Sequence, residues 1–212
     1  MNTFRNSYGK TVLFSMVKAI QKNKDYLGEV DSLIGDGDHG MNMNKGFTLF
    51  EKQYSDKDFS FSEGLESLGT ILFSQIGGSM GPIYGTIFMD AASAGMDLDE
   101  ISVGNLADIL SEGLTGLQEI VEAQVGDKTL VDTLSPAVDA LKSAAASDTD
   151  LPQALEEMKS AAEKGMHSTK DLTAKYGRSS RLGERSRGVL DAGAVSCCII
   201  LKAMADGIAE TL

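Results

Sequence analysis

Several features are scarce in this chain of 212 residues, and each absence excludes a class of protein. Only two cysteines are present, adjacent at Cys197 and Cys198, so no disulfide framework can form and reduced, cytosolic thiols are expected. Basic residues are outnumbered, with 19 Lys and Arg against 31 Asp and Glu, and the net charge of −12 argues against binding nucleic acid or an anionic membrane. No apolar run approaches the roughly 20 residues that a membrane-spanning helix needs. We therefore expect a cytoplasmic protein without a membrane segment.

The alternation typical of β-strands is also nearly absent, whereas apolar residues repeat with helical spacing along most of the chain. Such stripes occupy residues 13–20, 47–54, 65–72, 106–121, 134–141, 151–158 and 195–208. The three prolines stand where helix starts or kinks accept them, and Asp150 is a candidate cap before Pro152. No stretch resembles a domain linker. Residues 1–212 are predicted to form one all-α domain, a bundle of about eight amphipathic helices.

Glycine is plentiful, with 23 residues where an all-helical protein needs few. Eleven of them fall in three clusters: Gly35, Gly37 and Gly40; Gly77, Gly78, Gly81 and Gly85; Gly177, Gly183, Gly188 and Gly193. Glycine lets the backbone approach a ligand closely and exposes N–H groups at helix starts, where anions bind. The clusters indicate loops that meet around a phosphate-bearing ligand, with ordinary helix–helix turns as the alternative.

The most chemically distinctive segment places Asp31, Asp36 and Asp38 within eight residues. Mg²⁺ prefers a few carboxylates and completes its shell with water and substrate phosphate oxygens. These three side chains, called the acidic trio below, therefore predict a magnesium site. Three carboxylates and a diphosphate carry about six negative charges, which favours two Mg²⁺ ions over one.

Parts of the chain resemble three other ligand-binding motifs, but none of these motifs is supported. Residues 35–40 match the pattern GxGxxG, but they lack a βαβ context and include two aspartates that would repel a pyrophosphate. An EF-hand register fails because Met41 stands where glycine is needed and Phe47 where glutamate is needed. The Gly-Lys-Thr at 9–11 and the Asp-Lys-Thr at 127–129 each lack a glycine of the phosphate-binding loop motif.

A second segment, residues 170–187, is basic in an otherwise acidic chain and is called the basic segment below. Its charged residues are Lys170, Lys175, Arg178, Arg181, Arg185 and Arg187 against Asp171 and Glu184, a local charge of +4. Arginine holds a phosphate through two bonds at once, so the segment predicts a phosphate clamp or a docking edge for an acidic partner. A solvated helix terminus is the alternative reading of this segment alone.

Taken together, four segments and a short fifth one resemble the L subunits of dihydroxyacetone kinases. They are Ile-Gly-Asp-Gly-Asp-His-Gly-Met-Asn-Met-Asn (34–44), Gly-Gly-Ser-Met-Gly-Pro-Ile-Tyr-Gly-Thr (77–86), Gly-Asp-Lys-Thr-Leu-Val-Asp-Thr-Leu (126–134), Gly-Arg-Ser-Ser-Arg-Leu-Gly-Glu-Arg-Ser (177–186) and Asp-Ala-Gly (191–193). The resemblance spans nearly the whole chain in the family's order. It implies a barrel of eight antiparallel helices with a nucleotide bound across one end.

The resemblance also implies a role for individual residues. Asp31, Asp36 and Asp38 would hold two Mg²⁺ ions, and the nucleotide, ADP or ATP, would contact the following residues: His39, Gly40, Met41, Asn42, Ser79, Met80, Leu130, Arg178, Asp191, Ala192 and Gly193. Among these, Leu130 would pack on the adenine and Arg178 would neutralise phosphate. His39 is expected to order its loop or contact the nucleotide, and His167 to lie on the surface.

The implied activity is phosphoryl transfer, which asks the protein chiefly to position an in-line acceptor and to neutralise charge. In the resembling family, dihydroxyacetone is held on a separate K-type subunit, and ADP on the L subunit is rephosphorylated by a phosphohistidine of an M-type subunit. Three alternatives remain open: a kinase that uses free ATP, a kinase for a related ketose such as erythrulose, and a nucleotide-loaded regulator that binds a transcription factor.

Overall fold

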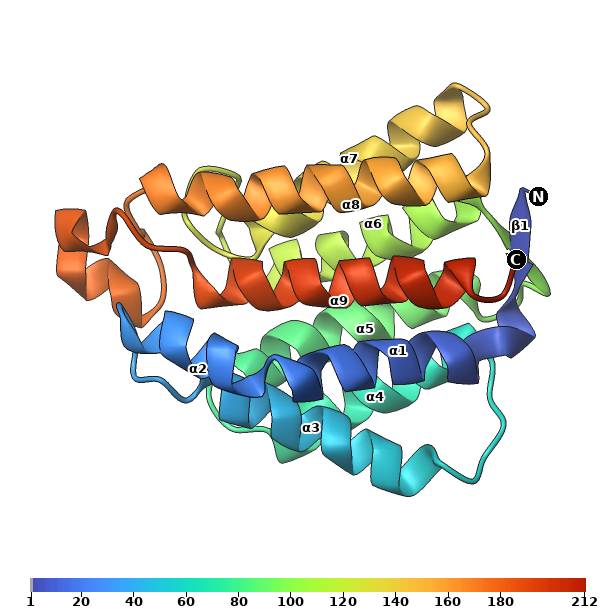
Figure 1. Cartoon of the computed structure of the whole chain (residues 1–212), viewed down its shortest axis with the longest axis horizontal. Coiled ribbons are helices and arrows are strands. Elements are labelled where there is room, and N and C mark those ends of the chain that lie inside the picture. Colours follow the sequence, from blue (N-terminus) through green and yellow to red (C-terminus); the bar gives the residue numbers. More distant parts are fainter. Residues whose placement is uncertain (1) are drawn as a thin grey trace.

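The computed structural model describes residues 2–212, which form a barrel of helices (Figure 1). In this part of the chain the α-helices are α1 Gly9–Lys22, α2 Lys24–Ser32, α3 His39–Tyr54, α4 Phe61–Gln75, α5 Met80–Gly95, α6 Val103–Ile120, α7 Val131–Ala146, α8 Leu151–Ser168 and α9 Ala192–Ala209. Two short strands and three 3₁₀ turns accompany them: β1 Thr3–Arg5, β2 Glu100–Ser102, η1 Asn6–Tyr8, η2 Thr169–Asp171 and η3 Arg178–Ser186. The predicted all-α class is confirmed.

The helices form a closed ring with eight positions. From α3 to α9 each helix packs on the next in sequence, α9 packs on α1, and α1 packs on α3 (Figure 1). Helix α2 continues from α1 after an interruption at Asn23, so these two helices share one position of the ring. This agrees with the expected count of about eight. Helices α2 and α5 lie outside the apolar stripes seen in the sequence.

Burial of the apolar stripes explains why the ring holds together. Phe47, Phe50 and Phe61 are fully buried, as are Leu13 and Met16, and they belong to one continuous apolar core. Helix α9 is long and apolar enough in composition to cross a membrane, but 72% of that window is buried inside the barrel. It is therefore a core helix, and its Cys197 and Cys198 are buried free thiols.

The alternating directions give the barrel two different ends. Helices α3, α5, α7 and α9 begin at the end on the left of Figure 1, called the site end below, where α2, α4, α6 and α8 finish. At the opposite end, called the far end, β1 pairs antiparallel with β2 through Phe4 and Ile101, and both chain termini lie there. The Asn6 amide fastens this end by donating to the carbonyl oxygens of Gly95 and Leu98 at 3.0 and 2.7 Å.

Candidate functional site

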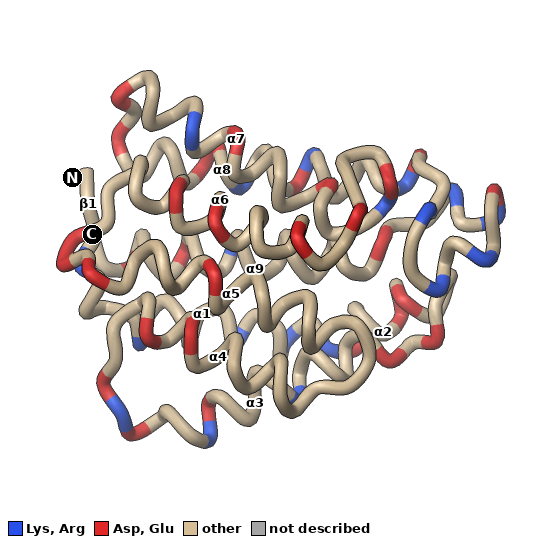
Figure 2. Tube along the Cα trace, turned by 180° about the vertical axis from the view of Figure 1, so that it is seen from behind, with Lys and Arg blue, Asp and Glu red and all other residues tan. Residues whose placement is uncertain are grey.

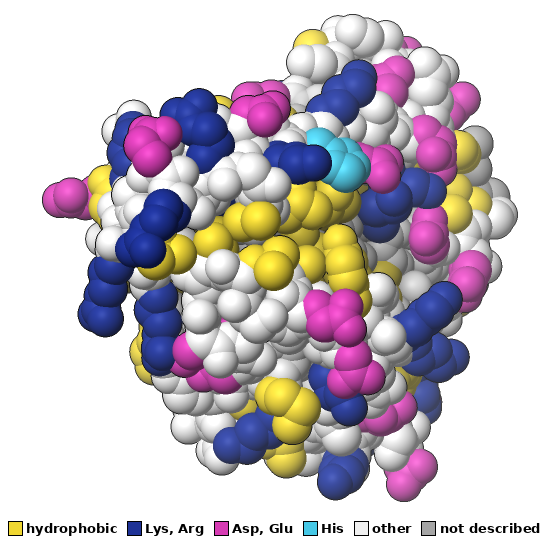
Figure 3. Space-filling model, turned by 60° about the vertical axis from the view of Figure 1, so that its left-hand side comes forward, with side chains coloured by type: hydrophobic (Ala, Val, Ile, Leu, Met, Phe, Trp, Pro, Cys, Tyr) yellow, Lys and Arg dark blue, Asp and Glu magenta, His cyan; other side chains and the backbone are white. Residues whose placement is uncertain are grey.

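The site end contains a cavity of about 400 Å³, a volume typical of small-ligand sites. Three of its walls come from distant parts of the chain: the loop between α2 and α3, the start of α5, and the segment between α8 and α9. Two of the three glycine clusters therefore meet, since Gly35 of the first and Gly177 and Gly193 of the third line this cavity, whereas the second cluster reaches it only through its neighbours Ser79 and Met80. In Figure 3, hydrophobic side chains gather in a depression of this end, with basic side chains beside it.

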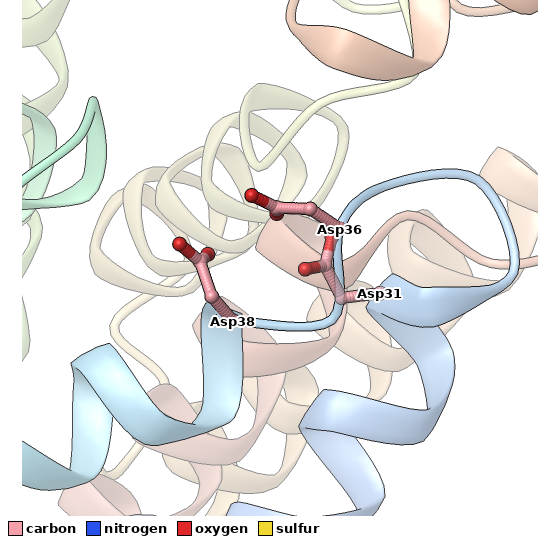
Figure 4. A group of neighbouring side chains, drawn as sticks. All are labelled: Asp31, Asp36 and Asp38. Carbon is pink, nitrogen blue, oxygen red and sulfur yellow. The ribbon is translucent and has the colours of Figure 1, made fainter.

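The acidic trio stands at the mouth of the cavity. Asp31 lies in the last turn of α2, Asp36 in the following loop, and Asp38 directly before α3. One carboxylate oxygen of each lies within 4.8 Å of the others, and the three side chains surround a common space in Figure 4. Hard carboxylate oxygens at this spacing fit a divalent cation such as Mg²⁺.

The backbone around the trio explains how the loop keeps this shape. Gly37 adopts a φ of 79°, which a side chain would disfavour. A Cβ on Gly35 would lie 2.2 Å from an Asp31 carboxylate oxygen, so the absence of a side chain makes room for this ligand. The backbone N–H of His39 donates to the other Asp31 oxygen at 3.3 Å and holds the carboxylate toward the loop.

Four helix starts face the cavity. Met80 of α5, Val131 of α7 and Ala192 of α9 line it, as does His39, the first residue of α3. Helix α5 begins without a side-chain hydrogen bond to its first N–H groups. The first N–H of α3 donates to Asp31, that of α7 donates to Thr129 Oγ1 at 3.2 Å, and Asp191 caps α9 by accepting from the Ala194 N–H at 2.8 Å. Helix N-termini attract anions, so this end suits a phosphate.

Charge across the mouth is complementary. Figure 2 shows basic positions gathered on the segment that protrudes beyond the helix ends, near the acidic positions that follow α2. The Arg178 guanidinium forms an ion pair with Asp36 and so connects the basic segment with the acidic trio. Burial raises the pKa of Asp191 to about 6, and the bond from the Ala194 N–H and the Lys128 cation oppose that rise.

A buried polar chain lies beneath the cavity. His39 Nε2 lies 2.8 Å from Ser196 Oγ, and Tyr84 Oη lies 2.7 Å from the same oxygen, so α3, α5 and α9 are linked near their N-termini. Burial lowers the pKa of His39 to about 4, although nearby Asp38 opposes this shift. His39 is therefore neutral at pH 7. His167 lies exposed on the surface, as predicted.

Most residues singled out in the sequence meet at this cavity, and some do not. Asp31, Asp36 and Asp38 line it together with the following predicted contacts: His39, Ser79, Met80, Leu130, Arg178, Asp191, Ala192 and Gly193. Gly40, Met41 and Asn42 are not among its lining residues. A Cβ on Gly40 would lie 1.9 Å from the Lys24 carbonyl oxygen, so this glycine allows α2 and α3 to pack closely.

Sequence reasoning missed other cavity residues. Lys128 and Tyr84 line the cavity, and both belong to segments that carried the family resemblance, which was the available signal. Tyr176 also lines it and Ser196 lies beneath it, but neither belongs to a recognisable motif. Val121, the last residue of the apolar stripe 106–121, forms part of the apolar wall.

Comparison with known proteins gives a consistent result. Residues 33–206 match the DAK2 domain family. The chain is 38% identical over 184 residues to the ADP-binding subunit DhaL of PEP-dependent dihydroxyacetone kinase from Escherichia coli (strain K12), covering 85% of this chain and 87% of the relative. It is 36% identical over 186 residues to the corresponding subunit of kinase 1 from Listeria innocua, covering 87% and 88%.

A solved structure shares the fold. The dihydroxyacetone kinase from C. freundii, in complex with AMP-PNP and Mg²⁺, superimposes with a TM-score of 0.71 at 21% identity. The match covers 92% of this chain and 33% of that longer chain. The helical barrel is therefore a fold already seen as one part of a larger kinase.

Proposed function

The chain belongs to the DAK2 domain family, and on that premise we propose that it is the ADP-binding L subunit of a phosphoenolpyruvate-dependent dihydroxyacetone kinase. The observation that carries this proposal is the acidic trio at the mouth of a cavity lined by helix N-termini. Carboxylates and N–H groups at one site suit a nucleotide diphosphate with its magnesium. The two relatives from Escherichia coli and Listeria innocua are ADP-binding subunits, and the match covers 87% and 88% of their length.

Different residues around the mouth of the cavity would bind the metal, the phosphates, the adenine and the sugar. Asp31, Asp36 and Asp38 would hold two Mg²⁺ ions, which would neutralise the charge of the phosphates. Arg178 already reaches the acidic trio and is placed to donate to the phosphates, and the start of α5 at Ser79 and Met80 offers backbone N–H groups. The apolar wall that includes Leu130 would take the adenine, and the first turn of α9 would face the sugar.

In this proposal both the phosphohistidine donor and the phosphoryl acceptor belong to partner subunits. Within residues 2–212, the histidine of the cavity, His39, is buried, neutral and bonded to Ser196, which does not suit it to carry a phosphoryl group. Exposed apolar side chains on the same end include Leu33, Met41, Val125 and Tyr176, which suits a docking surface. A K-type subunit that holds dihydroxyacetone and a phosphohistidine M-type donor are the proposed partners, in the cytoplasm.

Reconstitution with defined donors tests the proposal. The purified chain is analysed for bound ADP, then mixed with a K-type subunit, dihydroxyacetone, and either the phosphoenolpyruvate-driven phosphocarrier proteins or free ATP. We expect ADP bound at one per chain and dihydroxyacetone phosphate formed with the phosphocarrier proteins. Turnover with free ATP alone, or with erythrulose alone, would replace the proposal by the corresponding kinase. Bound ADP without any turnover would favour a regulator.

A further inference from the structure

Lys128 is a buried cation that the proposed function does not use. It lies in the loop before α7, has a backbone φ of 62°, and is 1% exposed. No ion pair found in residues 2–212 involves its ammonium group. Instead, Nζ donates to the carbonyl oxygen of Val189 at 2.5 Å and to that of Thr169.

Burying the Lys128 ammonium group is energetically unfavourable for the folded chain. Burial of an ammonium group without a carboxylate partner is unfavourable, and burial lowers the pKa of Lys128 despite the opposing charges of Asp191 and Asp132. A non-glycine residue at positive φ adds backbone strain to this cost. An apolar side chain would fill the same space without the charge. The two hydrogen bonds that its ammonium group donates to carbonyl groups are what offsets this cost.

The two bound carbonyl groups flank the basic segment, residues 170–187. Thr169 comes directly before it and Val189 follows it by two residues, so one ammonium group joins both ends of this loop. The ends are also joined by the Gly188 N–H, which donates to the Lys170 carbonyl oxygen at 2.7 Å. Lys128 thus closes the base of the loop.

Beyond this base, the loop contacts the residues before α7 through Lys175 and the acidic trio through Arg178. Lys175 Nζ lies 2.5 Å from Asp127 Oδ1, and the Lys175 N–H donates to the Asp127 carbonyl oxygen at 3.2 Å. Three residues later, Arg178 pairs with Asp36. The position of Arg178 therefore depends on a chain of contacts that starts at residues 127 and 128.

From this arrangement we infer that Lys128 is a positioning residue for the nucleotide phosphates, acting through Arg178. It holds both ends of the basic segment and thereby keeps the Arg178 guanidinium beside the acidic trio. This inference rests on the proposed function for its ligand. Its structural part, the closure of the loop, is independent of any nucleotide.

Limited digestion with trypsin tests the closure without ligand. Lys128→Met keeps the length of the side chain and removes the charge, so cleavage after the exposed Arg178, Arg181 and Arg185 is expected to accelerate about tenfold, because local unfolding lets this segment extend into the protease. Lys164→Met, an exposed lysine on α8, is the matched control and leaves that cleavage rate unchanged. Cleavage at the wild-type rate in Lys128→Met would overturn the inference.

Because Lys128→Met removes a buried group and can fail to fold, a measurement on the wild-type chain stands beside it. NMR of ¹⁵N-lysine-labelled protein is expected to show one ammonium group whose hydrogens exchange slowly, since both carbonyl bonds and burial protect them. Lys128→Arg assigns this signal by its loss. A Lys128 ammonium group that exchanges as fast as the surface lysines would contradict the closure.

A double-mutant cycle on Mg²⁺-ADP affinity tests whether Lys128 acts through Arg178. Supporting residues of this kind contribute about 10-fold to affinity, so Lys128→Met is expected to weaken binding about 10-fold in the wild-type background. In the Arg178→Met background the same change is expected to cost less than about twofold, because coupled residues are not additive. Equal losses in both backgrounds would overturn the inference. Failure of the wild-type chain to bind Mg²⁺-ADP would instead refute the proposed function, and the trypsin result would stand.

Discussion

The two ends of the barrel start the same kind of helix in different ways. At the far end, α4 and α6 each begin with a reciprocal capping box, Ser60 with Glu63 and Ser102 with Asn105, and Asp150 caps α8. At the site end, α3, α5 and α7 begin without a side-chain cap. A cap contributes about 1 kcal/mol to stability. N-cap side chains therefore satisfy the first N–H groups of these three helices at the far end, where only α1 of the described helices begins without one. At the site end, the first N–H groups of α5 are the ones left for a ligand.

The exception at the site end supports this distinction. Helix α9 has a capping side chain, Asp191, but burial raises the pKa of this residue to about 6. Asp150, a cap with the same chemistry at the far end, stands beside the exposed start of α8. The two aspartate caps therefore differ in their effect on stability, because ionised Asp191 is buried beside the cavity whereas Asp150 faces solvent.

The largest expected effect comes from removal of one charge of the acidic trio. Asp38→Asn keeps the size of the side chain and weakens a metal ligand, so Mg²⁺-ADP affinity is expected to fall at least about 100-fold in calorimetry. Asp56→Asn, an exposed acid elsewhere, is the control and leaves affinity unchanged. An affinity of Asp38→Asn within about twofold of wild type would mean that the site end does not bind the metal through this residue.

The unusual cap gives a prediction about pH. The Asp191 carboxyl group is protonated up to about pH 6 in the folded chain and up to about pH 4 in the unfolded one, so the folded state binds more protons between these values and stability falls as pH rises. Asn caps equally well and cannot ionise. Urea unfolding of Asp191→Asn without ligand is expected to show about 1–2 kcal/mol more stability than wild type at pH 8 and no difference at pH 4. A difference that grows toward low pH would contradict this.

An acidic side chain at the start of α5 should exchange binding for stability. The backbone of Ser79 is helical (φ −78°, ψ −23°) and does not suit a capping bond, but Ser79→Asp places a negative charge at the positive end of the helix dipole, which is expected to raise the free energy of unfolding by about 0.3–1 kcal/mol. The same carboxylate competes for the N–H groups and repels phosphate, so ADP affinity should fall about tenfold. Ser79→Ala separates the two effects, since the Ser79 side chain makes no capping bond and its loss should leave stability unchanged. Tighter ADP binding by Ser79→Asp would refute this comparison of the two ends.

The smallest effect is the reciprocal change at the far end. Ser60→Ala removes the oxygen that accepts the Glu63 N–H at 3.1 Å, so stability is expected to fall by about 1 kcal/mol in urea unfolding. ADP affinity should not change, because α4 begins at the opposite end of the barrel from the cavity. A loss of affinity in this variant would show that the two ends are coupled.

The sequence predicted the fold class well because most helices bury one face and leave the other in water. It did not show α5, which packs on both α4 and α6 and is apolar without a contrasting polar face. Helix α2 was missed for another reason, since it is nine residues long and buries only Leu27 and Val30. Periodicity detects a helix only where the two faces differ.

The candidate site was predictable where a side chain carries the chemistry. The residue type and spacing of Asp31, Asp36 and Asp38 predict a metal site, and the structure brings the three carboxylates together. Lys128 could not be predicted in this way, because its partners are the backbone carbonyl groups of residues 169 and 189, and every residue has a carbonyl group. Gly40 could not be distinguished from a ligand-contacting glycine until the neighbouring helix was placed.

Both termini lie at the far end, and this sets a geometric condition on any covalent link to another catalytic unit (Figure 1). Helix α9 has 18 residues, so a tether attached at the C-terminus starts about 27 Å from the cavity. An extended chain spans at most about 3.3–3.6 Å per residue, so a tether of fewer than about eight residues could not span this distance by itself. A longer tether would raise the local concentration of a fused module while leaving the mouth of the barrel unobstructed.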